Sequence, residues 1–280
     1  MYVTKCSGEK ERFMPEKIIR TLGRAGVSRK DAQTIVSEIK GKIYDGIQTK
    51  TILQLALNKL KKQDPISGAR YDLKRAIMNL GPTGFPFEQY FAEILRHHGY
   101  KTTVGRIFGG KLISHEIDVC AKKDSKTYLI ECKYHNAPGI YTSIKVALYV
   151  YARFLDLKEK FDSPWLATNT KFSDKVEKYA RGMGMRLTSW QYPKGESLQE
   201  LIETKNLYPI TILKSVNDSV KGKLSQANIM LVIHLADMDI EQLKRKTKLP
   251  ENVLRKIVEE ARGICGSEGE KKPQLNFTQK

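Results

Sequence analysis

The sequence is poor in cysteine, and its four cysteines are not paired by spacing. Cys6, Cys120, Cys132 and Cys265 stand far apart, and the 280 residues contain no C-x-x-C pair. A disulfide framework, or a zinc site built from cysteines, needs such pairs, so neither is indicated. We interpret the four cysteines as small buried or half-buried side chains.

Long apolar runs are also missing. No stretch reaches the roughly 20 apolar residues that a membrane-spanning helix needs, and no amphipathic anchor carries Trp on its apolar side. Residues 1–5 lack the charged and then apolar layout of a secretory signal. We therefore expect no membrane partner and a cytoplasmic protein.

Two further absences concern nucleotides and negative charge. No G-x-x-x-x-G-K-[ST] loop occurs, which argues against a motor-type ATPase within this chain. Acidic residues are outnumbered, because 49 Lys and Arg against 31 Asp and Glu leave a formal net charge of +18. Such an excess repels itself unless an anionic partner screens it. Double-stranded DNA is the partner that this charge favours.

The apolar pattern divides the chain into successive units. Residues 1–82 read as a short strand followed by helices, and two prolines and two glycines in residues 81–86 end that unit. Strands and helices then alternate, which predicts an α/β fold, a restriction-endonuclease-like mixed sheet flanked by helices. The last apolar pattern is purely helical. The predicted domains are 1–82, 83–215, 216–266 and a disordered tail at 267–280.

A predicted hairpin carries the most information about function. If its turn centres on residues 124–125, residues whose numbers sum to 249 lie opposite each other. Asp118 then faces Glu131, and Glu116 faces Lys133. All four share one face, because strand side chains alternate. The opposite face is predicted to carry the apolar side chains Ile117, Val119, Tyr128, Ile130 and Cys132.

Three carboxylates and a lysine on one face indicate a metal-assisted phosphodiesterase. Like charges a few ångströms apart are costly unless a cation binds between them. Asp118 and Glu131 offer the hard oxygen ligands that Mg²⁺ prefers, and Mg²⁺ also binds substrate phosphate. Lys133 would point into the same site, where it orients water or neutralises developing charge. The alternative interpretation is an exposed strand with an E-x-K triplet and no site.

The same residues resemble the PD-(D/E)xK nuclease superfamily, and within it the Mrr-like restriction endonucleases over residues 84–210. The resemblance rests on the segments Phe87-Glu88, Glu116-Ile117-Asp118, Glu131-Cys132-Lys133-Tyr134-His135 and Thr168-Asn169-Thr170. It implies that Glu88 joins Asp118 and Glu131 as a metal ligand and that Glu116 assists. The departures are Ile117, where Pro is expected, and Glu131, where this branch commonly has Gln.

Residues 2–82 resemble the ATP-cone, a small regulatory nucleotide-binding domain. The resemblance rests on Val3-Thr4-Lys5, Gly8, Glu11, Phe13, Glu16-Lys17-Ile18, Asp45-Gly46-Ile47, Thr49 and Ala69-Arg70-Tyr71. It implies that Lys5, Glu11, Lys17 and Thr49 contact the nucleotide, with ATP or dATP as the effector. The alternative is a basic helical domain that contacts DNA and no longer binds nucleotide.

Residues 235–261 resemble a helix-hairpin-helix module, with Leu249-Pro250-Glu251 in place of the usual glycines. Such a module would set backbone N–H groups against a DNA phosphate, and the alternative is a plain helical packing element.

Taken together, the sequence predicts a Mg²⁺-dependent, type II- or type IV-like restriction endonuclease that ATP or dATP regulates. Cutting both strands with one site per chain favours a homodimer or higher homo-oligomer. Two alternatives stay open: a nucleotide-responsive DNA-binding regulator without cleavage, and a structure-specific nuclease for repair or junctions.

Overall fold

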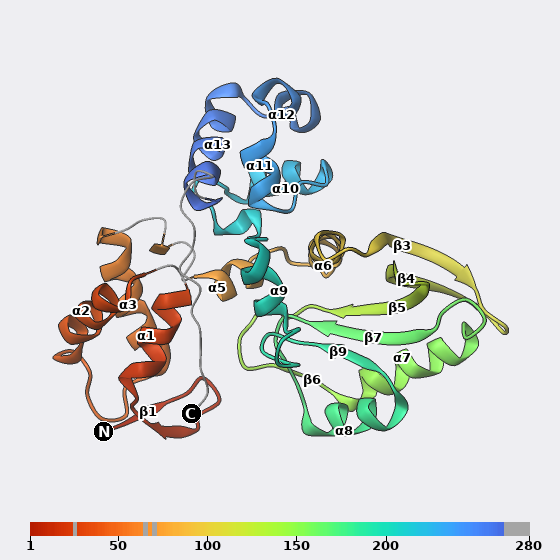
Figure 1. Cartoon of the computed structure of the whole chain (residues 1–280), viewed down its shortest axis with the longest axis horizontal. Helices are drawn as coiled ribbons and strands as arrows, with labels where there is room; N and C mark the ends of the chain where they lie inside the picture. The colour runs from red at the N-terminus through yellow and green to blue at the C-terminus, as the bar shows by residue number, and fades with distance from the viewer. Residues whose placement is uncertain (25–26, 64–66, 69–71, 266–280) are drawn as a thin grey trace.

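The computed structural model describes residues 1–24, 27–63, 67–68 and 72–265, with the backbone alone at 61–63. Figure 1 shows an N-terminal helical part, a sheet with helices on both sides, and a C-terminal group of helices. The predicted disordered tail at 267–280 lies outside the described residues. So does the segment Ala69-Arg70-Tyr71 of the ATP-cone resemblance.

The N-terminal part is a β-hairpin against three helices. Strand β1 pairs antiparallel with β2, and the apolar stripes of the helices close over Val3 in a small core of their own. Apolar residues at three- and four-residue spacing give each helix that buried stripe. The elements are β1 (Tyr2–Thr4), β2 (Lys10–Arg12), α1 (Pro15–Arg24), α2 (Arg29–Lys40) and α3 (Thr49–Gln63).

The central part holds a five-stranded mixed sheet of order β3-β4-β5-β7-β9. Strands β3, β4 and β5 are antiparallel neighbours, whereas β7 and β9 continue parallel to β5. The prediction of an α/β fold with a mixed sheet is confirmed. The strands are β3 (Lys101–Gly109), β4 (Ser114–Lys123), β5 (Lys126–Lys133), β6 (Tyr141–Thr142), β7 (Ser163–Thr168), β8 (Lys171–Phe172) and β9 (Arg186–Thr188).

Helices cover both faces of this sheet. Helix α6 (Phe85–His97) packs on β3 and β4, while α7 (Ile144–Asp156) and α8 (Asp174–Met183) pack on the other face against β7 and β9. Two separate buried clusters fill the two layers. The short helix α5 (Leu73–Met78) also buries its apolar side in the α6 layer, not in the N-terminal core.

The predicted hairpin register is confirmed from the turn to Val119 and Ile130, with two corrections. The ladder ends there, so the predicted pairs Asp118–Glu131 and Glu116–Lys133 are not part of it, and the predicted apolar face is divided between two layers. Val119 pairs with Ile130, and the turn at residues 124–125 has positive φ at both positions, as a tight two-residue hairpin turn requires. Ile117, however, packs in the α7 layer, whereas Val119 packs in the α6 layer. The β3–β4 ladder skips Gly105, whose φ is +61°, and Asp118, so the regular alternation of β4 is interrupted between Ile117 and Val119.

The C-terminal helices share the α6 core. One buried cluster runs from α5 and α6 through to α13. No described helix is long and apolar enough to cross a membrane. The elements are α9 (Leu198–Lys205), the 3₁₀ helix η1 (Ile210–Ile212), α10 (Asp218–Gln226), α11 (Val232–Asp237), α12 (Ile240–Thr247) and α13 (Glu251–Cys265).

Candidate active site

The acidic residues of the hairpin lie where β4 and β5 separate. Their ladder runs from Lys123 and Lys126 to Val119 and Ile130 and stops there, one pair before Asp118. The Asp118 carboxylate instead accepts the backbone N–H of Cys132, with Oδ2 2.8 Å from the nitrogen. The side chain therefore occupies the gap that opens between the two strands.

Four carboxylates converge at this gap. Burial, together with the charges of Asp118, Glu131 and Glu116, raises the pKa of Glu88 to about 7. Burial also raises the pKa of Asp118, and the charge of Glu116 raises it further. Burial likewise raises the pKa of Glu131, and the charge of Asp118 raises it further. The structure thus brings the predicted Glu88, Glu116, Asp118 and Glu131 into one electrostatic cluster, as expected of carboxylates that share a site.

Arg153 is a member of this cluster that the sequence analysis missed. Its guanidinium donates to Glu131 Oε2 at 2.7 Å and to the Glu116 carbonyl at 3.1 Å, and it also contacts the Tyr149 hydroxyl. The arginine side chain is 9% exposed and Glu131 17%. The missed signal is its place on the buried stripe of α7, because a buried charge needs a partner.

Lys133 ends β5 with an exposed side chain, and its charge acts on Asp118 and Glu131. The backbone beyond it is clamped by the Thr168-Asn169-Thr170 segment. Thr168 donates its hydroxyl to the Lys133 carbonyl at 2.7 Å, and the Asn169 amide bonds both the N–H and the carbonyl of His135. This polar clamp fixes where the lysine leaves the sheet.

The donor set fits a hard divalent cation. Glu88, Glu116, Asp118 and Glu131 carry four carboxylates, against which only Arg153 and Lys133 supply positive charge among the described residues that act on Asp118 and Glu131. Burial is the largest cause of the raised pKa values of Glu88, Asp118 and Glu131, and neighbouring carboxylates raise them further. A cation with oxygen ligands would offset both effects. Asp118, Glu131 and Glu88 carry carboxylates that act on one another or on a shared neighbour in this cluster.

The predicted nucleotide-contacting residues form a second charged group. Lys5 and Lys17 both pair with Glu11, at 3.3 Å and 2.8 Å, so β1, β2 and α1 meet there. Thr49 begins α3, directly after the segment that bridges to Thr4 of β1. A phosphate that binds Lys5 and Lys17 would therefore compete with the Glu11 carboxylate.

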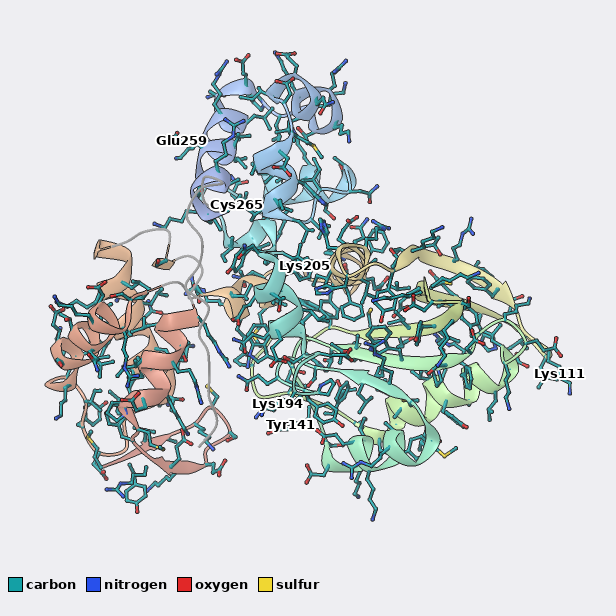
Figure 2. The ribbon with its side chains drawn as sticks, in the orientation of Figure 1. Lys111, Tyr141, Lys194, Lys205, Glu259 and Cys265 are labelled. Atoms are coloured by element: carbon teal, nitrogen blue, oxygen red, sulfur yellow. The ribbon has the colours of Figure 1, made fainter. Side chains whose placement is uncertain are left out.

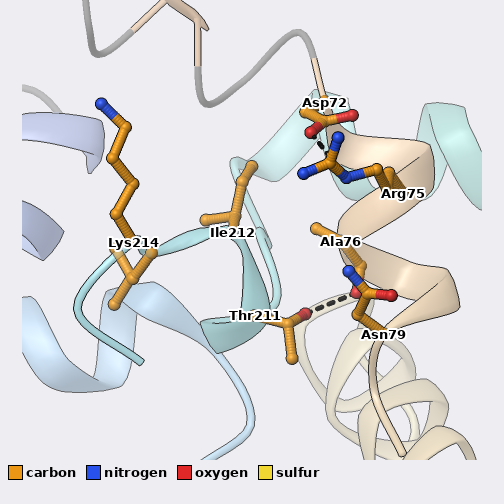
Figure 3. Close-up of a pocket in the computed structure, with 8 residues that line it drawn as sticks. Asp72, Arg75, Ala76, Asn79, Thr211, Ile212 and Lys214 are labelled. Atoms are coloured by element: carbon orange, nitrogen blue, oxygen red, sulfur yellow. Dashed lines mark hydrogen bonds and ion pairs between the residues drawn. The ribbon is translucent and has the colours of Figure 1, made fainter. Parts of the chain in front are cut away.

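Other candidates have structural partners. His115 Nε2 lies 2.8 Å from Asp156 Oδ2, and this carboxylate also accepts two backbone N–H groups of the β3–β4 turn. His135 contacts the Thr142 hydroxyl. A small pocket between α5 and η1 is closed by the Thr211 hydroxyl bond to the Ala76 carbonyl (Figure 3), and none of the acidic cluster lines it.

Comparison with known proteins decides the family. An uncharacterized protein of Archaeoglobus fulgidus is 42% identical over 176 residues, which are 62% of this chain and 99% of that protein. A family model described as AF1548-like, C-terminal matches residues 208–265, and the restriction endonuclease model matches 82–202. The chain belongs to the AF1548-like family and contains a domain that matches the restriction endonuclease model.

Two further matches complete the description of this AF1548-like protein. The ATP cone domain matches residues 1–74, which confirms the N-terminal resemblance. The solved "Crystal Structure of Protein of Unknown Function AF1548" is 39% identical, with a TM-score of 0.61, over 65% of this chain and 98% of that one. The Mrr-like and ATP-cone resemblances drawn from the sequence are therefore confirmed.

Proposed function

We propose that this protein is a Mg²⁺-dependent DNA endonuclease. The observation that carries the proposal is the convergence of Glu88, Asp118 and Glu131, with Lys133 beside them, where β4 and β5 separate. The restriction endonuclease match and the +18 charge support a DNA substrate. Neither a lone E-x-K triplet nor a basic surface would carry it alone.

The protein's own residues have distinct parts in hydrolysis. Mg²⁺, held by Asp118, Glu131 and Glu88, would supply positive charge to the scissile phosphate and to the attacking water. Lys133 neutralises the negative charge that grows on the phosphate oxygens and orients the water by hydrogen bonding. Arg153 holds the Glu131 carboxylate in position through their 2.7 Å ion pair. Glu116, exposed at the edge of the cluster, accepts a proton from water.

The test is cleavage of supercoiled and linear duplex DNA with Mg²⁺. Asp118→Asn and Lys133→Ala should each lower the rate by about 10²-fold or more, because each removes a charge that acts on the reacting phosphate. Asp218→Asn and Lys122→Ala are matched controls, since both residues are exposed and lie outside the cluster. Tight DNA binding without cleavage of plain, modified or branched DNA would reject the enzyme and favour a DNA-binding regulator.

We also propose that ATP or dATP binds the N-terminal domain through Lys5 and Lys17. A phosphate would displace Glu11 from the two lysines, which suit phosphate as compact charges. Lys17→Ala should weaken nucleotide binding by about tenfold, or 1.4 kcal/mol, with Lys42→Ala, an exposed lysine of the same domain, as the control. Calorimetric titration measures both. Equal affinity of the Lys17 variant and the natural protein would contradict the assignment.

A further inference from the structure

A second group of metal-ligating side chains lies on α6, away from the acidic cluster. Gln89, Glu93 and His97 follow each other at four-residue spacing and so form one stripe of the helix. Glu93 stands about 140° around the helix from Glu88, at 3.6 residues per turn. This stripe faces α11, where His234 completes the group.

The donor atoms of these three residues are already gathered. Glu93, His97 and His234 each place one donor within 4.8 Å of the others. Glu93 Oε2 is 3.9 Å from His234 Nε2, beyond hydrogen-bond distance, and the two imidazole rings stack with centroids 5.8 Å apart. Arg96 pairs with the other carboxylate oxygen, Oε1, which leaves Oε2 directed at the histidine.

We propose that Glu93, His97 and His234 bind a Zn²⁺ ion. Two imidazoles and one carboxylate form a donor set that Zn²⁺ takes readily, whereas Mg²⁺ prefers oxygen ligands alone. Tetrahedral bonds of about 2.0–2.1 Å need donors about 3.4 Å apart, which small side-chain rotations reach from the present positions. Water takes the fourth position. This site is independent of the proposed nuclease activity.

The ion would join the C-terminal helices to the nuclease fold. Elsewhere on the same stripe, Gln89 donates to Asn228 at 2.7 Å and accepts from Ser225 at 3.2 Å, so α6 already faces the loop and helix that precede α11. On the other side, Lys205 of α9 donates to the His97 carbonyl, and Figure 2 labels it at this junction. The metal would add a bond across an interface that is otherwise polar here.

Calorimetric titration of the full-length, metal-stripped protein with ZnCl₂ tests the site. Excess MgCl₂ in the buffer occupies the acidic cluster, so that Zn²⁺ taken up there does not confuse the result. We expect one Zn²⁺ per chain and a rise in melting temperature on its addition. Glu93→Gln, His97→Ala and His234→Ala should each lower the affinity at least about tenfold and abolish the rise.

His115→Asn is the matched control, because His115 bonds Asp156 at the β3–β4 turn and should leave Zn²⁺ affinity unchanged. Should one of the three ligand variants fail to fold, the other two still decide the matter, because all three positions are only partly buried. Absence of stoichiometric Zn²⁺ binding by the natural protein would overturn the proposal. So would equal affinity in the control and in the three ligand variants.

Discussion

Two clusters of candidate ligands depend on the same helix, and they are assembled in opposite ways. Around Glu88, near the start of α6, carboxylates share a site yet no three of them bring one oxygen each within 4.8 Å, among the described residues. Around His97, near its end, three donors meet that limit. Ionised carboxylates repel one another, whereas neutral imidazoles do not. Repulsion between the side chains therefore opposes close approach in the first cluster and not in the second.

The acidic cluster also contains its own cation. Arg153 bonds Glu131 at 2.7 Å, and its Nε is buried without a hydrogen-bond partner in the structure. The buried Nε therefore loses its hydration without gaining a hydrogen bond, while the rest of the guanidinium holds the Glu131 carboxylate in place. Arg96, which pairs with Glu93 in the histidine cluster, is by contrast exposed. Substitution of Arg153 should therefore give the largest difference in stability between the two clusters.

The largest effect is expected from Arg153→Ala. Loss of the guanidinium leaves Glu131, whose side chain is 17% exposed, without its ion-pair partner. Breaking a buried ion pair costs about 3–5 kcal/mol. Saturating Mg²⁺ should restore much of the lost free energy of unfolding, because a bound cation compensates the same carboxylate. Urea unfolding in EDTA and in MgCl₂ measures both values.

Arg106→Ala provides the comparison, because Arg106 is exposed on β3 of the same sheet and its loss should change stability by no more than about 0.5 kcal/mol. An Arg153 variant that loses the same free energy with and without Mg²⁺ would show that the arginine acts through packing alone. That result would contradict the proposal that the acidic cluster binds Mg²⁺.

The parts of the site that could be predicted are those that short-range rules govern. A two-residue turn at residues 124–125 sets the hairpin register, and the register pairs the residues from Lys123 and Lys126 to Val119 and Ile130, which brings Asp118 and Glu131 to the end of the ladder. Ile117 escaped the same rule because the β3–β4 ladder is interrupted between it and Val119, where Gly105 on the neighbouring strand has a positive φ. Nothing in the hairpin's own sequence carries that information.

Contacts between distant segments set the limit of sequence prediction. Arg153 of α7 bonds Glu131 of β5, which lies 22 residues earlier in the chain. His234 meets α6 from more than a hundred residues away. His97 reads as an isolated histidine in the sequence, because His234 becomes its neighbour only in the folded chain. By contrast, the ATP-cone resemblance names Lys5, Glu11 and Lys17 together, and both lysines pair with Glu11 in the structure.

A smaller effect is expected from pH, and it sharpens the contrast between the two clusters. The pKa of Glu88 in the folded protein, about 7, lies above its ordinary value because of burial and the charges of Asp118, Glu131 and Glu116. A carboxyl whose pKa is raised by folding binds its proton more tightly in the folded state. Its stabilising contribution is complete below the ordinary pKa and is lost as pH rises through about 7.

In EDTA, therefore, the free energy of unfolding should fall between pH 5 and pH 7.5, roughly the interval between the ordinary and the raised pKa. Glu88→Gln should flatten that fall, although Asp118 and Glu131, whose pKa values are also raised, leave part of it. Mg²⁺ should flatten it in the natural protein, because a cation favours the ionised carboxylates. Unfolding curves that fall equally in the natural protein and in Glu88→Gln would contradict the placement of Glu88 in the acidic cluster.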